Sequence, residues 1–273
     1  MLDTFSHMQS SGDACAYRVD VEFTVRRPIP VAVWSGMYLY RELLTMLEHY
    51  GVKFHHRGVK PFTISPILDA DGVEYMDTGI LEPGEAYRFR FSTADLHLLE
   101  AFRRAIGGGN DYLDVIRVGI RKVDLATNQG KTPRRSKYLA TVRLRFLPTL
   151  FKFRSFEVLY PSPHRFLLSV LRDFYRITGT DLRALLQRVM LETELILDKT
   201  RVFRLCIGRD GSGRERCLRA FRGEAVYAIL IKGDYLHFIT KLFELAGALG
   251  VGKNRSIGLG HVDIIGMKVK ELS

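Results

Sequence analysis

The order of the periodic segments constrains the fold of this chain more than any other feature of its sequence. Residues 17–25 alternate apolar and polar side chains, as a half-buried strand does. A helical pattern follows, and then come strand patterns near 62–67 and 87–91, a helical pattern over 96–106 and a strand pattern over 113–125. Strand, helix, strand, strand, helix, strand is the order of a split βαβ unit. The first half of the chain therefore predicts a ferredoxin-like domain.

The first helical pattern predicts which side chains of that helix are buried. Pro28 and Pro30 stand where a helix can begin, and the pattern ends near Gly51. Its apolar stripe consists of Val33, Met37, Leu44 and Leu47. Tyr40 falls on this stripe, whereas Tyr38 shares the polar face with Arg41, Glu42, Thr45 and His49.

The second half repeats the same order, although the two halves share no visible sequence repeat. Strand patterns cover 138–147, 200–207, 216–231 and 261–269, and helical patterns cover 163–177 and 234–249, with Asp181 as the expected cap of a further helix. We therefore predict an α+β protein of two tandem ferredoxin-like (RRM-like) domains with antiparallel sheets. The expected divisions are a flexible arm at 1–16, an N-terminal domain at 17–130 and a C-terminal domain at 131–273.

A glycine-rich loop at 250–260 stands between the last helical pattern and the closing strand. Glycine lets the main chain adopt positive φ and approach a ligand closely, so the loop predicts a backbone cradle for phosphates. A glycine-rich connection without a ligand is the alternative. It is not a P-loop, because Asn254 stands where a Ser or Thr for Mg²⁺ is needed and the loop follows a helix. The candidate contacts are Gly250, Gly252, Lys253, Asn254, Arg255, Ser256, Gly258 and Gly260.

The charge of the chain favours a polyanionic partner. The formal net charge is +11, and arginine outnumbers lysine, which suits recognition of phosphates and base edges. A charge of this size also serves solubility alone. The densest basic positions, which are candidate RNA contacts, are Arg134, Arg135, Arg143 and Arg145, and then Arg216 and Arg219.

The cysteines and the hydropathy pattern predict the compartment. Cys15, Cys206 and Cys217 form no C-x-x-C pair and are odd in number, so we expect neither a disulfide framework nor a zinc knuckle. No apolar run reaches the roughly 18 residues of a membrane span, and no secretory pattern opens the chain. We predict a reducing, cytoplasmic location and no membrane partner.

The C-terminal pattern resembles that of a known family. Residues 221–227, a helix and then the Gly-Lys-x-x-Ser-x-Gly-Leu-Gly form within 250–260 resemble the CRISPR-associated endoribonucleases of the RAMP superfamily, which cut repeat RNA into guide RNAs. The resemblance implies CRISPR repeat RNA, or precursor crRNA, as the partner, and cleavage without metal or cofactor. The 2′-hydroxyl upstream of the scissile phosphate attacks, leaving a 2′,3′-cyclic phosphate and a 5′-hydroxyl. A CRISPR effector complex is a further candidate partner, and the protein is expected to be a monomer or a homodimer.

The resemblance also indicates catalytic candidates. Family members that use a His, Lys and Tyr set carry the Tyr in the first helix, the His in the loop after it and the Lys before the next strand. His55, His56 and Lys60 match this order, with Tyr40 or Tyr38 in the helix. Histidine suits both proton transfers and lysine suits the phosphate charge. A solvated loop with ordinary surface side chains is the alternative.

Two other functions remain open from the sequence. Other RAMP proteins hold guide RNA in effector complexes without cutting it, so a non-catalytic RNA-binding subunit is the main alternative. A structural protein with incidental positive charge is the third. For the enzyme, we expect an RNA groove between the two domains, with the glycine loop on one side and the loop from His55 to Lys60 within reach.

Overall fold

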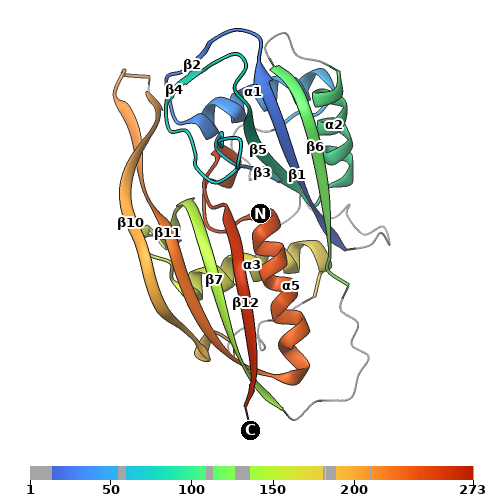
Figure 1. Cartoon of the computed structure of the whole chain (residues 1–273), viewed down its shortest axis with the longest axis vertical. Helices are drawn as coiled ribbons and strands as arrows, with labels where there is room; N and C mark the ends of the chain where they lie inside the picture. The colour runs from blue at the N-terminus through green and yellow to red at the C-terminus, as the bar shows by residue number, and fades with distance from the viewer. Residues whose placement is uncertain are drawn as a thin grey trace.

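A computed structural model of the chain describes residues 14–54, 60–108, 113–126, 136–180, 182, 189–209 and 211–272. It contains two four-stranded antiparallel sheets, one above the other in Figure 1, with strand orders β3-β5-β1-β6 and β10-β11-β7-β12. The predicted α+β fold of two tandem ferredoxin-like domains is confirmed. Most of the predicted arm, the predicted boundary at 130/131 and Asp181 lie outside the described residues.

The upper sheet in Figure 1 packs against two helices. Its core includes Val19, Val21, Phe91 and Phe102, and the stacked rings of Phe91 and Phe102 lie 4.0 Å apart. The carboxylate of Asp95 caps the second helix by accepting hydrogen bonds from the first-turn N–H groups. The elements are β1 (Cys15–Val25), α1 (Ser35–His49), β3 (Phe62–Ile64), β5 (Tyr87–Thr93), α2 (Leu96–Gly107) and β6 (Leu113–Asp124).

The predicted start of the first helix was wrong, and its predicted apolar stripe was right only in part: Leu47 is buried in the core, and Met37 and Leu44 pack against buried core residues. Pro30 lies in the short strand β2 (Ile29–Val31), which pairs only with β4 (Gly79–Leu81) among the described strands. Proline fits such an edge position because no ladder hydrogen bond is needed from its nitrogen. The buried side chains of α1 are Leu39, Leu43 and Leu47, whereas Val33, Met37 and Leu44 are half-buried.

The lower sheet covers a larger core. Helices α3 and α5 pack on each other, with the rings of Phe166 and Phe243 5.3 Å apart. Strands β10 and β11 run longer than predicted and reach the N-terminal domain (Figure 1). The elements are β7 (Lys137–Thr149), β8 (Phe151–Phe153), β9 (Phe156–Val158), α3 (Pro163–Thr178), β10 (Thr193–Arg209), β11 (Glu215–Lys232), α5 (Gly233–Leu249), the 3-10 helix η1 (Arg255–Ile257) and β12 (Val262–Leu272).

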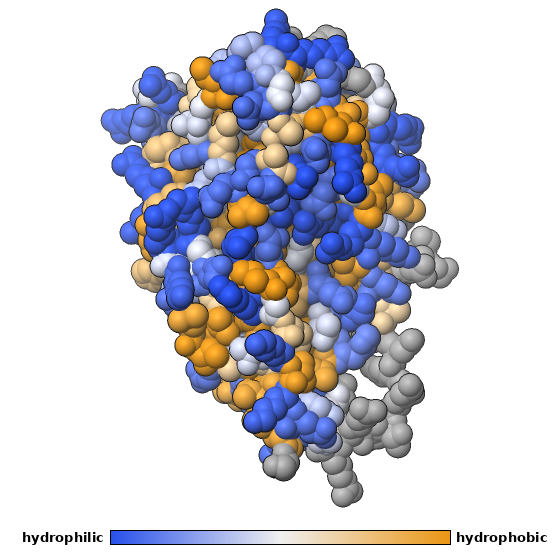
Figure 2. Space-filling model, in the orientation of Figure 1, coloured by the Kyte–Doolittle hydropathy of each residue, from blue (hydrophilic) through white to orange (hydrophobic). Residues whose placement is uncertain are grey.

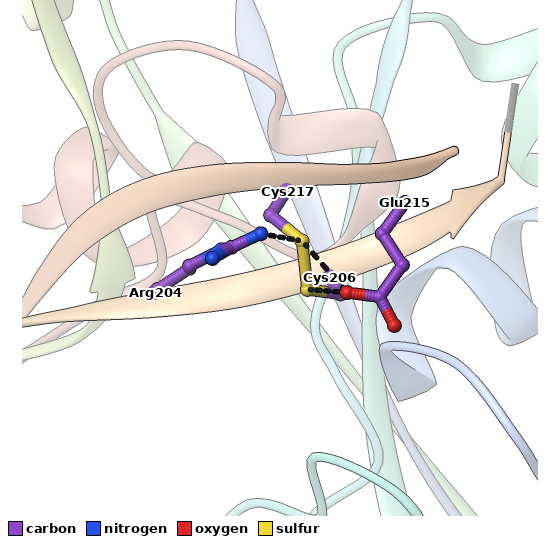
Figure 3. The surroundings of a disulfide bond; sticks show 4 residues. All are labelled: Arg204, Cys206, Glu215 and Cys217. Atoms are coloured by element: carbon purple, nitrogen blue, oxygen red, sulfur yellow. Dashed lines mark hydrogen bonds between the residues drawn. A yellow bond between two sulfur atoms is a disulfide. The ribbon is translucent and has the colours of Figure 1, made fainter.

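A disulfide joins Cys206 and Cys217, contrary to the sequence prediction (Figure 3). The two residues stand directly opposite each other in the β10–β11 register. Antiparallel pairing brings together residues 11 apart in sequence, which a search for C-x-x-C spacing misses. The expectation of a reducing compartment rested on unpaired cysteines and loses that support.

The surface view in Figure 2 shows mainly hydrophilic side chains interrupted by smaller apolar patches. Within the described part of the chain, no helix is long and apolar enough to cross a membrane.

Candidate nucleic-acid interface and active site

The glycines of the loop at 250–260 are required by its backbone. Gly250, Gly252, Gly258 and Gly260 all have φ between 71° and 92°, a region that side chains with a Cβ rarely adopt. A Cβ on Gly252 would lie 2.5 Å from the carbonyl oxygen of Leu150, and one on Gly260 would meet the carbonyl oxygen of Val251. The loop is therefore a close-packed structure whose shape excludes other residues.

Most N–H groups of the loop donate hydrogen bonds within the protein. Those of Val251, Gly252, Lys253 and Gly260 donate to the Gly260 carbonyl, the Ser169 hydroxyl, and the Leu150 and Pro148 carbonyls, at 2.7–2.9 Å. The N–H groups of Arg255 and Ser256 lie instead in the first turn of η1, where a helix leaves its donors without internal partners. If the loop binds a phosphate, these donors and the exposed side chains of Lys253 and Asn254 are the groups positioned for it.

Arg255 is engaged inside the C-terminal domain. Its guanidinium donates to both carboxylate oxygens of Asp173 on α3, at 2.6 and 3.0 Å. It also donates to the carbonyl oxygens of Leu249 and Gly250. A phosphate contact by Arg255 would have to compete with a nearly buried carboxylate, so its first role in the structure is to hold the loop on α3.

The loop also joins the two domains. The indole N–H of Trp34, the only tryptophan of the chain, donates to the Ile257 carbonyl oxygen at 2.6 Å. The Trp34 backbone N–H donates to the Cys206 carbonyl oxygen at 3.2 Å. Gly36 and Gly258 face each other, since a Cβ on Gly258 would lie 2.7 Å from the Gly36 Cα. At this point the predicted groove between the domains is filled by packed atoms; elsewhere the groove stays a prediction.

Beside the loop, the two domains also contact each other through a polar network. Arg90 of β5 donates to Asp263 of β12 at 2.7 Å, and Arg18 lies 3.9 Å from the same carboxylate. His261 is 2% exposed and forms a hydrogen bond with the Ile64 backbone, while its Nε2 has no partner among the described residues. Burial, and then the positive charge of Arg90, lower the pKa of His261 to about 3. His261 is therefore neutral at physiological pH.

The structure brings two of the predicted catalytic residues to one aromatic cluster. The Tyr40 ring stacks on Phe62 at 6.2 Å, and Phe54 meets Phe62 edge-on at 5.4 Å. The Lys60 ammonium lies 5.4 Å from the centre of the Phe54 ring. Burial raises the pKa of Tyr40, so its hydroxyl stays protonated at neutral pH and is suited to donate a hydrogen bond rather than to act as a base.

The other predicted catalytic residues are His55, His56 and Tyr38. His55 and His56 lie outside the described residues, between Phe54 and Lys60 in the chain. Tyr38 is half-buried and packs on the N-terminal core, as Tyr40 does. The predicted place of Tyr40 on the apolar face is confirmed, whereas the predicted place of Tyr38 on the polar face was wrong, because its ring also packs on the core.

The predicted basic residues lie among acidic partners. Arg143 donates to Glu224 at 2.5 Å and Arg145 lies 3.8 Å from the same residue. The strand register sets Lys199 opposite Glu224, Glu224 opposite Arg145, and Arg145 opposite Asp263. The face of the sheet is thus a row of alternating charges, and the hydrogen bond from Arg143 lowers the pKa of Glu224. Arg219 donates to Glu157 at 2.9 Å, Arg216 is exposed, and Arg134 and Arg135 lie outside the described residues.

Sequence reasoning missed two features beside the loop. Trp34 was not singled out, because it fell inside the predicted first helix, whereas the observed helix begins at Ser35. The β8–β9 hairpin was also missed, because its residues carry no strand alternation long enough to notice. It exposes Phe153 and Phe156 next to the glycine loop.

Among the described residues, one group has the spacing of metal ligands, namely Cys206, Glu215 and Cys217. Its two sulfur atoms are joined to each other, and a carboxylate oxygen of Glu215 lies 3.8 and 3.9 Å from them (Figure 3). With the disulfide formed, Glu215 alone of the three keeps a free ligand group, which is too few for a metal site.

The sequence model of the family described as CRISPR-associated endoribonuclease Cas6 matches residues 144–262, from β7 through the glycine loop to the start of β12. Over this part of its length the chain is similar to the Cas6 family. A search among curated proteins found no match to it. The matched residues include the glycine loop, on which the resemblance seen in the sequence rests.

Solved structures show the same fold over nearly the whole chain. A Thermus thermophilus Cas6 is 20% identical with a TM-score of 0.64, and the match covers 93% of this chain and 99% of that one. The product complex of the same Cas6 is 19% identical with a TM-score of 0.66, over 92% and 100% of the two chains. The product of a Cas6-related gene from Pyrococcus furiosus is 16% identical with a TM-score of 0.54, over 92% and 98%. At these identities the likeness shows the fold.

Proposed function

We propose that this chain cuts CRISPR repeat RNA in precursor crRNA by a metal-independent reaction. The upstream 2′-hydroxyl attacks the phosphorus, the bond to the 5′-oxygen breaks, and the products are a 2′,3′-cyclic phosphate and a 5′-hydroxyl. One group takes the proton from the 2′-hydroxyl and another gives a proton to the leaving 5′-oxygen. The cytoplasm remains the proposed compartment.

The observation that carries the proposal is the placement of Lys60 and Tyr40 on one aromatic cluster, whose Phe54 directly precedes His55 in the chain. A histidine supplies the proton transfers, and Lys60 stabilises the negative charge that develops on the phosphate. Tyr40, with its raised pKa, donates a hydrogen bond. A histidine-to-alanine mutant of a related Cas6 is among the similar solved structures, which supports testing histidine first.

We propose that the glycine loop at 250–260 binds the RNA. Complexes of two related Cas6 proteins contain a product. We infer that Lys253, Asn254 and the N–H groups at the start of η1 contact phosphates of the repeat, with the exposed Arg216 adding charge. The arginines that already pair with Glu224 contribute less, because each must first leave a carboxylate.

The test uses labelled repeat RNA in EDTA, together with a copy that carries a 2′-deoxy sugar immediately upstream of the cut. We expect wild type to cut the first RNA and not the second. His55→Ala or His56→Ala should slow single-turnover cutting by 10²-fold or more, which is the usual contribution of a proton-transfer group. Lys60→Ala should also slow it, whereas Lys53→Ala, an exposed lysine in the same region, should not.

Other outcomes would change the conclusion. Cutting of the deoxy RNA would exclude attack by the 2′-hydroxyl, and loss of activity in EDTA would exclude a metal-independent reaction. If wild type binds the repeat RNA tightly and leaves it intact, the chain is better described as a guide-RNA-holding subunit.

A further inference from the structure

The β8–β9 hairpin exposes aromatic rings that the domain core does not use. Phe156 is 70% exposed and Phe153 is 47% exposed, and the two face each other in the hairpin register. At the base of the hairpin, Phe151 is only 2% exposed and belongs to the C-terminal core. The hairpin is therefore anchored at one end and presents bare aromatic surface at the other, a feature that marks binding sites.

Two arginines lie against the Phe153 ring. The Arg165 guanidinium of α3 lies 4.3 Å from the centre of the Phe153 ring, and that of Arg154 lies 5.7 Å from it. Lys152 on the same strand is exposed. Aromatic rings and guanidinium planes both stack on unpaired nucleobases, and the positive charges attract the phosphates between them. This composition favours RNA over an apolar protein partner.

The hairpin is continuous with the glycine loop. The carbonyl oxygen of Leu150, the residue before β8, accepts the hydrogen bond from the Lys253 N–H at 2.9 Å. The Phe151 ring lies 3.2 Å from the position of a Cβ on Gly252. Phe153 is three residues beyond Leu150, or about 10 Å along a strand. The ring surface is thus within reach of the nucleotides next to one whose phosphate contacts Lys253.

We propose that Phe156 and Phe153, with Arg165 behind them, form a stacking platform for unpaired nucleotides of the RNA that the glycine loop holds. The inference rests on the proposed function for its ligand, RNA, and is independent of whether the chain cuts that RNA. Stacking tolerates any base, so the platform adds affinity and fixes the path of the strand without reading its sequence.

Binding of labelled RNA by anisotropy tests the platform. Phe156→Ala should weaken binding about tenfold, as loss of one stacked base does, and Phe156→Trp should restore it. The salt dependence should keep its slope in Phe156→Ala but lose about one unit in Lys253→Ala, because only the lysine contacts a phosphate. Tyr175→Ala, which removes a ring 54% exposed on α3, is the matched control and should bind as wild type.

Repeat RNA carrying 2-aminopurine at one position at a time locates the stacked base. Wild type should quench the fluorescence at one or two adjacent unpaired positions, and Phe156→Ala should release that quenching. Wild-type affinity and quenching in both Phe156→Ala and Phe153→Ala would overturn the platform even in an enzyme that cuts normally. Quenched RNA that is never cut would support the platform while the proposed cleavage fails. Variants that keep RNA binding but lose a protein partner would overturn it in favour of a protein-docking surface.

Discussion

Two arginines share the carboxylate of Asp173 and differ in burial. The Arg255 side chain is 17% exposed and lies 2.6 Å from it, whereas Arg176 is 52% exposed and lies 3.7 Å away. Arg255→Ala leaves Asp173, 8% exposed, without its buried partner, so we expect a loss of about 3–5 kcal/mol of unfolding free energy. Arg176→Ala should cost at most about 1 kcal/mol. Urea unfolding of the two variants measures the difference.

A further variant separates the ion pair from the loop contact. Arg255→Ala combined with Asp173→Ala should recover part of the loss, because no charge then stays buried alone. Equal, small losses in Arg255→Ala and Arg176→Ala would show that Arg255 is free for RNA, as the sequence suggested. The sequence offered no sign of this pair, since its members lie 82 residues apart.

The contact between α1 and the glycine loop depends on the absence of a side chain at Gly36. A Cβ at this position would clash with the Ile257 carbonyl oxygen and lie 2.7 Å from the Gly258 Cα. Gly36→Ala should therefore separate the helix from the loop and lower the stability by more than about 1 kcal/mol, although alanine normally favours a helix. Gly107→Ala in α2, where nothing lies within 4 Å, should stabilise the protein by about 0.4–1 kcal/mol.

Trp34 reports on this contact, since its fluorescence is the only tryptophan signal. Gly36→Ala should shift its emission to longer wavelength in the folded protein and Gly107→Ala should not. Unchanged emission and stability in Gly36→Ala would contradict the close packing.

Helical periodicity located α1 to within a few residues at its C-terminal end but not at its start. The reason is that Ile29–Val31 is held as strand by β4, some 50 residues later in the chain.

At the scale of the whole molecule, the repeated order of elements was sufficient to predict both sheets, because alternation and helical spacing are local. The joint between the domains was not predictable. Its contacts pair Trp34 with Ile257 and with Cys206, and Arg90 with Asp263, and none has a local pattern. The same holds for the candidate site. The order of the elements and the family resemblance located the glycine loop and the region from Tyr40 to Lys60. That most N–H groups of the loop donate hydrogen bonds within the protein follows only from the packing of the folded chain.

Acid should weaken the folded state through His261, which is buried and forms a hydrogen bond with the Ile64 backbone of the other domain. Its pKa is about 3 in the folded protein and roughly 6.5 in an unfolded chain. As pH falls below 6.5, His261 therefore binds a proton in the unfolded state but stays neutral in the folded state. The contribution of His261 to the unfolding free energy is complete above pH 6.5 and is lost as pH falls. Between pH 7.5 and pH 5 the loss should be about 2 kcal/mol in urea unfolding followed by Trp34 fluorescence. His261→Gln should lose about 2 kcal/mol less than wild type over this range, while the exposed His97→Gln should keep the full wild-type loss. An equally steep loss in His261→Gln would assign the acid sensitivity to other groups.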